Sequence, residues 1–191
     1  FGIVVNQEGL RFYDEGEDFW PKRYAIWGRL VAQQPDQIAY SIVDSKVKDR
    51  FMPSVFPPIE ASSLNELATE LGVNSSSLIN TVQQFNQAVQ KGDYDPSKLD
   101  GKQTLGLSPD KTNWALTLDS PPFLAYPLRP GITFTYLGLK INEQAQVLNQ
   151  NDTPFDNVTA AGEIMAGNVL GEGYCAGTGM TIGGVFGRIA G

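Results

Sequence analysis

The sequence predicts an α+β fold with a mixed first part of strands and helices and a shorter C-terminal part of strands and one helix. Two capped helical windows in the middle of the chain and a β-branched run around a glycine turn near its start support this prediction. In addition, ten of the twenty glycines lie in residues 162–191 and lead into an apolar helical pattern. Such glycines either let backbone N–H groups approach a flat or anionic ligand or form a tightly packed loop.

The first 43 residues predict a hairpin, a helix and a strand. β-branched and aromatic residues in 2–6 and 10–14 flank the turn at 7–9. A helix is expected from Phe19 to Gln34, because apolar residues recur there at helical spacing, namely Tyr24, Ile26, Trp27, Leu30 and Val31. The strand-like run 37–43 then leads to Asp44.

Two central helices carry the clearest local signals. Ser63 and Glu66 have capping-box spacing, and Gly72 is expected to end that helix. Asn74 opens the second helix, which Gly92 is expected to stop. Its apolar residues share one face, and they are Leu78, Val82, Phe85 and Val89. We expect both helices to be core architecture.

The chain between 92 and 141 is predicted to be a loop followed by a strand. Residues 92–122 have little periodicity and many turn-forming residues, so they predict a long loop closed by Pro121-Pro122. Gly131–Ile141 alternates only partly, which is typical of a strand buried on both sides. Arg129 lies between two prolines that restrict the backbone and aim its guanidinium at a carboxylate, unless it is a solvated turn residue.

Composition excludes several classes of site. The 14 basic and 21 acidic residues give a net charge of −7, and no clustered basic face suggests a nucleic-acid partner. The chain has no histidine, and no cysteine or carboxylate cluster has metal-ligand spacing, so no metal site is expected. The single Cys175 suits a reducing compartment, and we expect a cytoplasmic protein without a membrane span.

The C-terminal segment resembles FAD-dependent oxidoreductases of the fumarate reductase and succinate dehydrogenase flavoprotein family. Residues 160–163 match the family's A-A-G-E, and residues 186–191 match F-G-R-x-A-G. Residues 131–149 lie where the family has a T-x-G-G-x-x-I-D strand and a hairpin, and residues 8–16 resemble G-x-R-F-x-[ND]-E. Within the family, residues 131–140 and 171–180 most resemble the corresponding segments of tricarballylate dehydrogenase and of the flavoprotein of precorrin-3B synthesis.

The resemblance implies a domain division. Residues 1–130 would be the substrate-capping domain, and residues 131–191 the C-terminal strands and helix of a split Rossmann-like FAD-binding domain. No G-x-G-x-x-G turn for the FAD pyrophosphate precedes residue 130. The looser match at 171–176 has no βαβ unit around it, and we interpret it as chance. We therefore expect this chain to be a fragment that lacks the N-terminal dinucleotide-binding half of the FAD-binding domain and is inactive by itself.

The family also implies which residues bind FAD. Glu163, just after Gly162, would accept hydrogen bonds from ribityl or ribose hydroxyls and is the best single cofactor-binding candidate; the alternative is an N-terminal helix or loop carboxylate. Four residues at the start of the last helix would place N–H groups and the positive helix end near the flavin pyrimidine edge, and these are Gly177, Thr178, Gly179 and Met180.

Substrate-binding hydroxyls are expected near the flavin at Thr133, Thr135 and Tyr136. The catalytic candidates are Arg129, Tyr174 and Arg23. Tyrosine is a poor base near pH 7, so packing is the alternative role for both tyrosines.

Two departures from the fumarate reductases bear on the substrate. Phe134 lies where those enzymes have a histidine, and Tyr174 where they have a substrate-binding arginine. The cap arginine that donates a proton has no clean equivalent, since its aligned position falls near Phe19, with Lys22 and Arg23 close by. Fumarate reduction by the same apparatus is therefore not expected. Arg129, Arg23 and Lys22 could instead surround a substrate with several carboxylates.

The implied activity is hydride transfer between a substrate carbon and flavin N5, as in oxidation of tricarballylate to cis-aconitate. The enzymatic alternative is the cobalamin-pathway flavoprotein of precorrin-3B synthesis. An alternative of another class is a non-catalytic cap or interaction module. The expected partners are a small carboxylate substrate and an electron-acceptor protein or quinone-linked partner.

Overall fold

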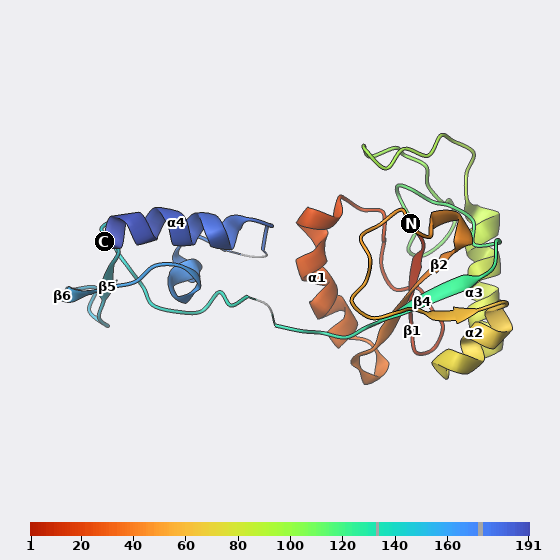
Figure 1. Cartoon of the computed structure of the whole chain (residues 1–191), viewed down its shortest axis with the longest axis horizontal. Helices are drawn as coiled ribbons and strands as arrows, with labels where there is room; N and C mark the ends of the chain where they lie inside the picture. Colours follow the sequence, from red (N-terminus) through yellow and green to blue (C-terminus); the bar gives the residue numbers. More distant parts are fainter. Residues whose placement is uncertain (133, 172–173) are drawn as a thin grey trace. The chain divides into compact units, whose positions relative to one another are not determined.

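The computed structural model describes residues 1–132, 134–171 and 174–191 (Figure 1). The chain divides into two compact units, which we describe separately. The first unit comprises Phe1–Trp20 and Trp27–Pro130, and the second comprises Pro21–Ile26 and Gly131–Gly191. The mixture of helices and antiparallel strands agrees with the predicted α+β class.

A four-stranded antiparallel sheet forms the centre of the first unit. Its strands lie in the order β1-β2-β4-β3, with bounds β1 Ile3–Asn6, β2 Ala39–Asp44, β3 Ile59–Ala61 and β4 Phe123–Leu128. Strand β4 pairs with β2 along its whole length, from Ala39 opposite Leu128 to Asp44 opposite Phe123. The chain therefore returns from its long loop to an inner position of the sheet.

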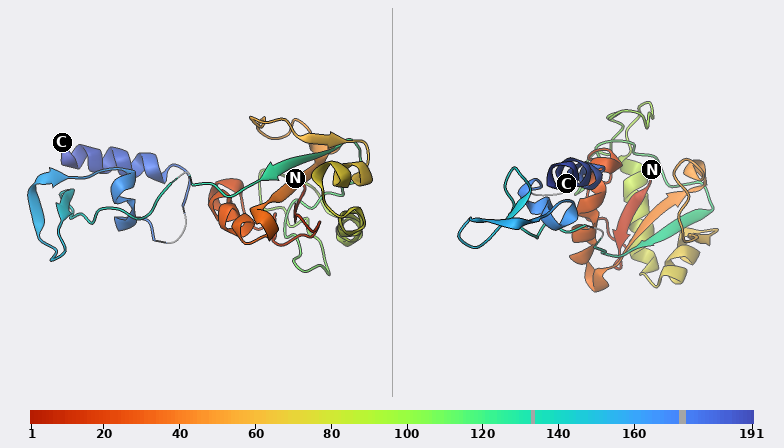
Figure 2. Two further views of the ribbon diagram at one scale, coloured as in Figure 1. Left: turned by 90° about the horizontal axis from the view of Figure 1, so that it is seen from below. Right: turned by 60° about the vertical axis from the view of Figure 1, so that its left-hand side comes forward.

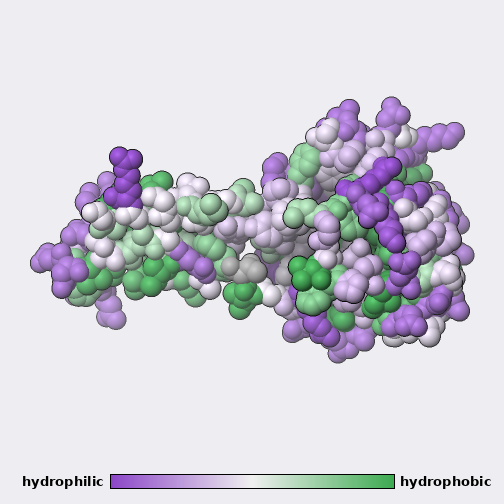
Figure 3. All heavy atoms as spheres, viewed as in Figure 1, coloured by the Kyte–Doolittle hydropathy of each residue, from purple (hydrophilic) through white to green (hydrophobic). Residues whose placement is uncertain are grey.

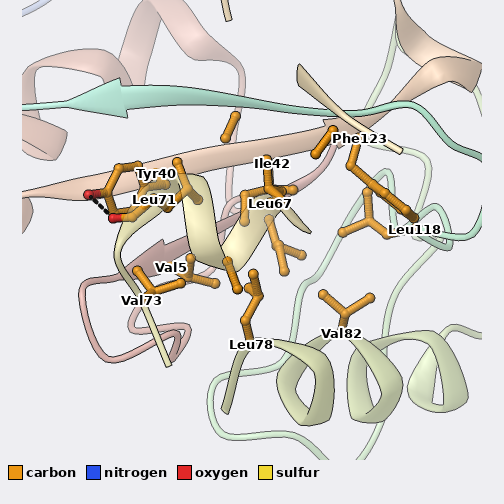
Figure 4. Packing of buried hydrophobic residues seen from close by; sticks show 14 of the residues in the cluster. Val5, Tyr40, Ile42, Leu67, Leu71, Val73, Leu78, Val82, Leu118 and Phe123 are labelled. Atoms are coloured by element: carbon orange, nitrogen blue, oxygen red, sulfur yellow. Dashed lines mark hydrogen bonds between the residues drawn. The ribbon is translucent and has the colours of Figure 1, made fainter. Parts of the chain in front are cut away.

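Helices cover both faces of this sheet (Figure 2). Helices α2, Leu64–Leu71, and α3, Ser75–Ala88, pack on one face, and α1, Trp20–Ala32, packs on the other. Because side chains alternate along a strand, Tyr40 and Ile42 of β2 face α2 and α3 while Ala39 faces α1. Figure 4 shows the resulting core, in which Leu67, Leu78 and Val82 are buried.

The predicted capping signals act where expected. The Ser63 side chain accepts the Glu66 N–H, Gly72 ends α2 with φ +67°, and the Asn74 side chain accepts the Ser77 N–H. Helix α3 ends at Ala88 rather than near Gly92. The chain turns there because the Ala88 carbonyl accepts the Leu105 N–H and Val89 forms a bridge with Thr104.

The predicted hairpin near the start is only partly correct. Strand β1 and the turn at 7–9 form, but residues 10–14 contribute a single bridge, Val5 with Arg11, instead of a second strand. The reason lies in the side chains of this segment, since Arg11 and Glu15 turn inward and the Glu15 carboxylate binds the Val4 N–H. Residues 92–122 form the long loop that was predicted, without helix or strand.

A buried polar network joins this loop to β1. Arg11 and Glu15 form a two-pronged ion pair, with Nε to Oε1 at 3.0 Å and Nη2 to Oε2 at 2.6 Å. Arg11 Nη1 also donates to the Pro109 carbonyl at 2.8 Å, and its guanidinium lies 5.2 Å from the Phe85 ring centroid. Lys111 is fully buried and donates to the Gly2 carbonyl at 2.6 Å.

The second unit consists of a hairpin, a short 3-10 helix and a final helix. Its elements are β5 Gln146–Leu148, β6 Pro154–Thr159, η3 Glu163–Asn168 and α4 Thr178–Ala190. The hairpin and α4 were predicted. The strand predicted at Gly131–Ile141 was wrong, because the described residues of that segment are mostly exposed and bond to η3 through isolated groups, such as Leu139 N to Ile164 O, instead of a ladder.

The described helices do not include one that could cross a membrane. Within residues 1–132, 134–171 and 174–191, each helix is too short or too polar to span a membrane. Among the same residues, no three His, Cys, Asp or Glu side chains come together in a way that could hold a metal ion. Figure 3 shows hydrophobic side chains at the surface among the polar ones.

Burial lowers the pKa of the Lys111 ammonium below its ordinary value of 10.5, with Glu15 opposing the shift. The unfolded chain then binds more protons at this position than the folded chain, so stability rises with pH as the pH approaches 10.5. Lys111→Met should remove this rise, which is at most about 1.4 kcal/mol per pH unit. Equilibrium unfolding between pH 7 and 10, followed by tryptophan fluorescence, measures it, because all three tryptophans lie in the first unit.

The control is Lys98→Met, which changes an exposed lysine of the same loop. Its pH profile should match that of the unsubstituted protein. Equal profiles for Lys111→Met and the unsubstituted protein would contradict the role assigned to the buried ammonium.

Candidate functional site

The candidate site lies in the second unit, where the segment 134–139 packs against η3. Two glycines permit this approach. A Cβ at Gly138 would lie 1.8 Å from the Ile164 carbonyl oxygen, and a Cβ at Gly167 would lie 2.2 Å from the backbone carbonyl oxygen of Tyr136. Asn168 adds side-chain bonds to Leu139 O at 2.8 Å and from Ile141 N at 3.1 Å. The backbone of 134–139 is therefore held against η3.

Glu163 fastens the same segment at the start of η3. Its Oε1 atom accepts both the backbone N–H of Thr135 at 2.8 Å and the Thr135 hydroxyl at 3.0 Å. The carboxylate is exposed, and Oε2 takes part in neither bond. Gly162, just before it, has φ +83° and ψ −151°, a conformation that is essentially restricted to glycine. The Gly162-Glu163 pair thus presents a fixed carboxylate with one oxygen available to a hydroxyl donor.

The first turn of α4 supplies the second feature of the site. Gly177 is the N-cap residue with φ +87°, and it provides no side-chain acceptor. The N–H groups of Gly179 and Met180 belong to this first turn, where helical amides have no partner within the helix. The Thr178 hydroxyl is directed to the Cys175 carbonyl at 2.6 Å. The turn therefore offers N–H groups and the positive end of the helix dipole to an acceptor.

Two aromatic side chains, Phe134 and Tyr174, lie against this turn, and Tyr136 packs on Phe134. The Phe134 and Tyr174 ring centroids are 4.7 Å apart, and Phe134 also meets Tyr136 edge-on at 6.1 Å. A Cβ on Gly179 would lie 2.8 Å from the Phe134 ring and 3.3 Å from the Tyr174 hydroxyl oxygen. Burial, and next the neighbouring Tyr174, raise the pKa of Tyr136 above its ordinary value of 10.0. Tyr136 is therefore a hydrogen-bond donor near neutral pH.

Arg129, Arg23 and Thr133 were also singled out in the sequence. Arg129 is exposed in the first unit, at the end of β4, and its Nη1 donates to the Asp36 carbonyl at 3.1 Å. Arg23 is half-buried in α1. Thr133 and part of the chance glycine match, Glu172 and Gly173, fall outside the described residues.

The sequence did not assign a role to Asn168 or to the two glycines at 138 and 167. Their signal was weak, because a glycine or asparagine in a loop has many local explanations. Only the three-dimensional contact with residues 134–141 shows that they position the segment that carries Thr135 and Tyr136.

The arrangement suits a flavin. One exposed carboxylate oxygen can accept from sugar or ribityl hydroxyls, and an uncapped helix start can face an electron-rich carbonyl edge. The family model described as "FAD binding domain" matches residues 2–182. The chain belongs to this family of FAD-binding domains. FAD is accordingly its cofactor.

Relatives of known activity support the family. The chain is 30% identical over 179 residues to the NADH:acrylate oxidoreductase of Vibrio harveyi, covering 88% of this chain and 16% of that protein. A flavocytochrome c3 fumarate reductase in an open conformation matches with TM-score 0.68 and 25% identity, over 98% of this chain and 31% of that one. The chain thus spans less than a third of the length of either protein.

A further solved structure is similar at the same level. The 3-ketosteroid-Δ4-(5α)-dehydrogenase of Rhodococcus jostii RHA1, in complex with 4-androstene-3,17-dione, matches with TM-score 0.66 and 26% identity. The match covers 99% of this chain and 37% of that protein.

Two glycines of α4 give a matched test of the aromatic contact. Gly179→Ala should destabilise α4 by about 1–3 kcal/mol, because the new Cβ overlaps the Phe134 ring. Gly184→Ala, which has open space around it, should stabilise the helix by about 0.5–1 kcal/mol. Amide hydrogen exchange across 178–190 measures both changes. Faster exchange in Gly184→Ala, or slower exchange in Gly179→Ala, would contradict the packing described.

Proposed function

We propose that the protein is an FAD-dependent oxidoreductase that acts on a carbon–carbon bond beside a carboxyl group. Residues 1–130 form its substrate cap, and residues 131–191 form the C-terminal part of its FAD domain. The observation that carries this proposal is the second unit's combination of the Glu163 carboxylate with the uncapped start of α4. When bound, FAD supplies N5 as the hydride acceptor or donor.

Glu163 holds the sugar or ribityl part of the cofactor. Thr135 engages Oε1 and so fixes the plane of the carboxylate, which leaves Oε2 to accept a hydroxyl. Gly162 supports this role because its positive φ turns the chain sharply at the end of the strand that precedes the carboxylate.

The start of α4 faces the pyrimidine edge of the flavin. Gly177, Thr178, Gly179 and Met180 contribute backbone groups and the helix dipole there, which favour negative charge on the reduced ring. Glycine at 179 is needed for another reason, since Phe134 and Tyr174 occupy the space of a side chain.

A carboxylate substrate is the first candidate. The names of the acrylate oxidoreductase and the fumarate reductase both describe unsaturated carboxylates. In this chain Nη1 of Arg129 donates a hydrogen bond to the Asp36 carbonyl. The other N–H groups of its guanidinium are proposed to bind a substrate carboxylate together with Arg23. Thr133 and Tyr136 are proposed to donate hydroxyl hydrogen bonds to the same substrate, and Thr135, whose hydroxyl donates to Glu163, can only accept one from it. We propose tricarballylate, oxidised to cis-aconitate, as the specific compound.

A ketone substrate is the second candidate, and the aromatic group favours it. Phe134, Tyr136 and Tyr174 form an aromatic group, and the Tyr136 hydroxyl, whose pKa is raised, suits a carbonyl oxygen as a hydrogen-bond donor. The similarity to a dehydrogenase crystallised with a 3-oxosteroid points in the same direction. In this alternative Tyr174 binds the substrate oxygen and Arg129 has no contact with the substrate.

Glu163→Ala should lower the amount of FAD retained during purification without unfolding the protein, because it removes the acceptor for the cofactor hydroxyl. Removing one charged hydrogen bond of this kind corresponds to roughly a tenfold weaker affinity or more. Flavin absorbance per mole of protein measures the effect. The control is Glu143→Ala, an exposed carboxylate in the turn before β5. Unchanged flavin content in Glu163→Ala would remove this residue from the site.

Anaerobic mixing of the full-length protein with candidate substrates tests the activity. Bleaching of the flavin band near roughly 450 nm by tricarballylate is expected for the first candidate, since flavin reduction is the hydride step. Bleaching by a 3-oxosteroid and not by tricarballylate would support the second candidate. Tyr174→Phe should then slow the ketone reaction strongly, whereas Arg129→Gln should slow only the carboxylate reaction. A flavin that neither compound reduces would contradict both substrates.

A further inference from the structure

The site of the second unit contains a fourth aromatic residue, Tyr24. Residues Pro21–Ile26, near the start of α1, belong to this unit. The Tyr24 ring meets the Tyr174 ring edge-on, with centroids 6.0 Å apart and an interplanar angle of 80°. The Tyr174 ring also packs against Phe134, at a centroid distance of 4.7 Å. Tyr174 is therefore held by two aromatic side chains.

Tyr24 contributes a hydroxyl as well as a ring. Its hydroxyl forms a hydrogen bond with the Tyr174 side chain. Partial burial, and next Tyr174, raise the pKa of Tyr24 above its ordinary value of 10.0, and Tyr136 and Cys175 act in the same direction. A hydrogen bond that raises the pKa of an acid is one that its neutral form donates. Tyr24 is therefore the donor of this bond, and the Tyr174 oxygen is the acceptor.

The direction of this bond determines what Tyr174 can do. A tyrosine hydroxyl has one hydrogen to donate, and its oxygen accepts. Since the Tyr174 oxygen accepts from Tyr24, the hydrogen of Tyr174 is left for another acceptor. In a chain of two hydroxyls the first bond polarises the second, so Tyr174 becomes a stronger donor than an isolated tyrosine.

The Tyr174 hydroxyl lies beside the first turn of α4. A Cβ on Gly179, in that turn, would lie 3.3 Å from the Tyr174 hydroxyl oxygen. The same turn is proposed above to face the pyrimidine edge of the flavin. A substrate that exchanges a hydride with N5 must lie against the flavin ring system. The Tyr174 hydrogen is therefore available to an oxygen atom of that substrate.

We propose that Tyr24 is a positioning residue of the substrate site. Its hydroxyl donates to Tyr174, and Tyr174 donates its own hydrogen to a substrate oxygen next to the reacting carbons. Phenylalanine would make the same ring contact, so the hydroxyl is what tyrosine adds at position 24. The inference rests on the proposed function, because it needs a substrate bound at the flavin. It applies to a carboxylate oxygen and to a ketone oxygen.

The hydroxyl pair is tested first without a substrate. The FAD-bound full-length protein is labelled with ¹³C at tyrosine Cζ, whose NMR chemical shift follows the ionisation of each hydroxyl, and Tyr24→Phe identifies the Tyr24 signal. Tyr174→Phe keeps the ring and removes the hydroxyl, so the pKa of Tyr24 should fall towards its ordinary value in this variant. An unchanged pKa of Tyr24 would overturn the inference, whatever the substrate.

The rate of flavin reduction then tests the role of the pair. With the compound that reduces the flavin, Tyr24→Phe should lower the limiting rate constant by about tenfold, with unchanged FAD content. Adding Tyr24→Phe to Tyr174→Phe should cause no further loss, because Tyr24 acts through Tyr174. A double variant in which the two single losses multiply would show independent roles and contradict the proposal.

The matched control is Tyr126→Phe. This tyrosine also meets an aromatic ring edge-on, at 5.8 Å from Phe51 in the first unit. Its rate of flavin reduction should be unchanged, and a loss equal to that of Tyr24→Phe would count against a specific role for Tyr24. If neither candidate compound reduces the flavin, the proposed substrates fail, and the titration of Tyr24 still decides whether the hydroxyl pair exists.

Discussion

The first unit depends on the buried ion pair between Arg11 and Glu15. Both charged groups are almost fully shielded, with side-chain exposures of 6% and 7%, and they meet through two parallel hydrogen bonds. The pair also forms hydrogen bonds with the backbone: Glu15 accepts the Val4 N–H, and Arg11 donates to the Pro109 carbonyl. Breaking one partner of such a pair typically costs about 3–5 kcal/mol, because the other charge stays buried. One interaction thus joins β1, the long loop and, through Phe85, helix α3.

The same principle explains how residues 92–122 keep a defined path without secondary structure. Carboxylate and amide side chains replace the missing ladder: Asp14 accepts the Thr112 N–H, Asn113 donates to the Gly16 carbonyl, and Asp100 accepts the N–H groups of Lys102 and Trp114. A loop of this length would otherwise leave many backbone groups unpaired. Its ordering follows from its anchoring to the segment that contains Arg11 and Glu15.

The elements that could be predicted from sequence are those with local signals. Helices α2 and α3 have caps within a few residues, and α4 follows a glycine series, so periodicity identified all three. Strand β4 was not predicted because it contains Pro127 and directly follows Pro121-Pro122. Residues 131–141 looked like a strand, but a strand needs a continuous partner, and the described residues of this segment bond to η3 and β5 through isolated groups.

The site shows the same limit. Glu163 was identified from its motif, whereas its bond to Thr135 joins residues that are 28 positions apart and have no shared pattern. Likewise the sequence marked Gly179 as a cofactor contact, and the structure adds that its missing side chain makes room for Phe134 and Tyr174. The residues 8–16 matched a family motif only loosely, and spacing alone did not indicate that Arg11 and Glu15 form the central ion pair of the first unit.

The second unit is stabilised differently from the first, and this difference bears on its function. Its buried cluster is small, and apolar residues on β6 and α4 remain about half exposed, including Phe155, Val185 and Ile189. Units of about 60 residues bury a smaller share of their surface than larger domains and are correspondingly marginal. Close backbone approaches at Gly138 and Gly167 therefore carry much of its order. If FAD binds the folded second unit as proposed, its binding free energy adds to that stability, and FAD binding is then thermodynamically linked to the order of residues 134–139.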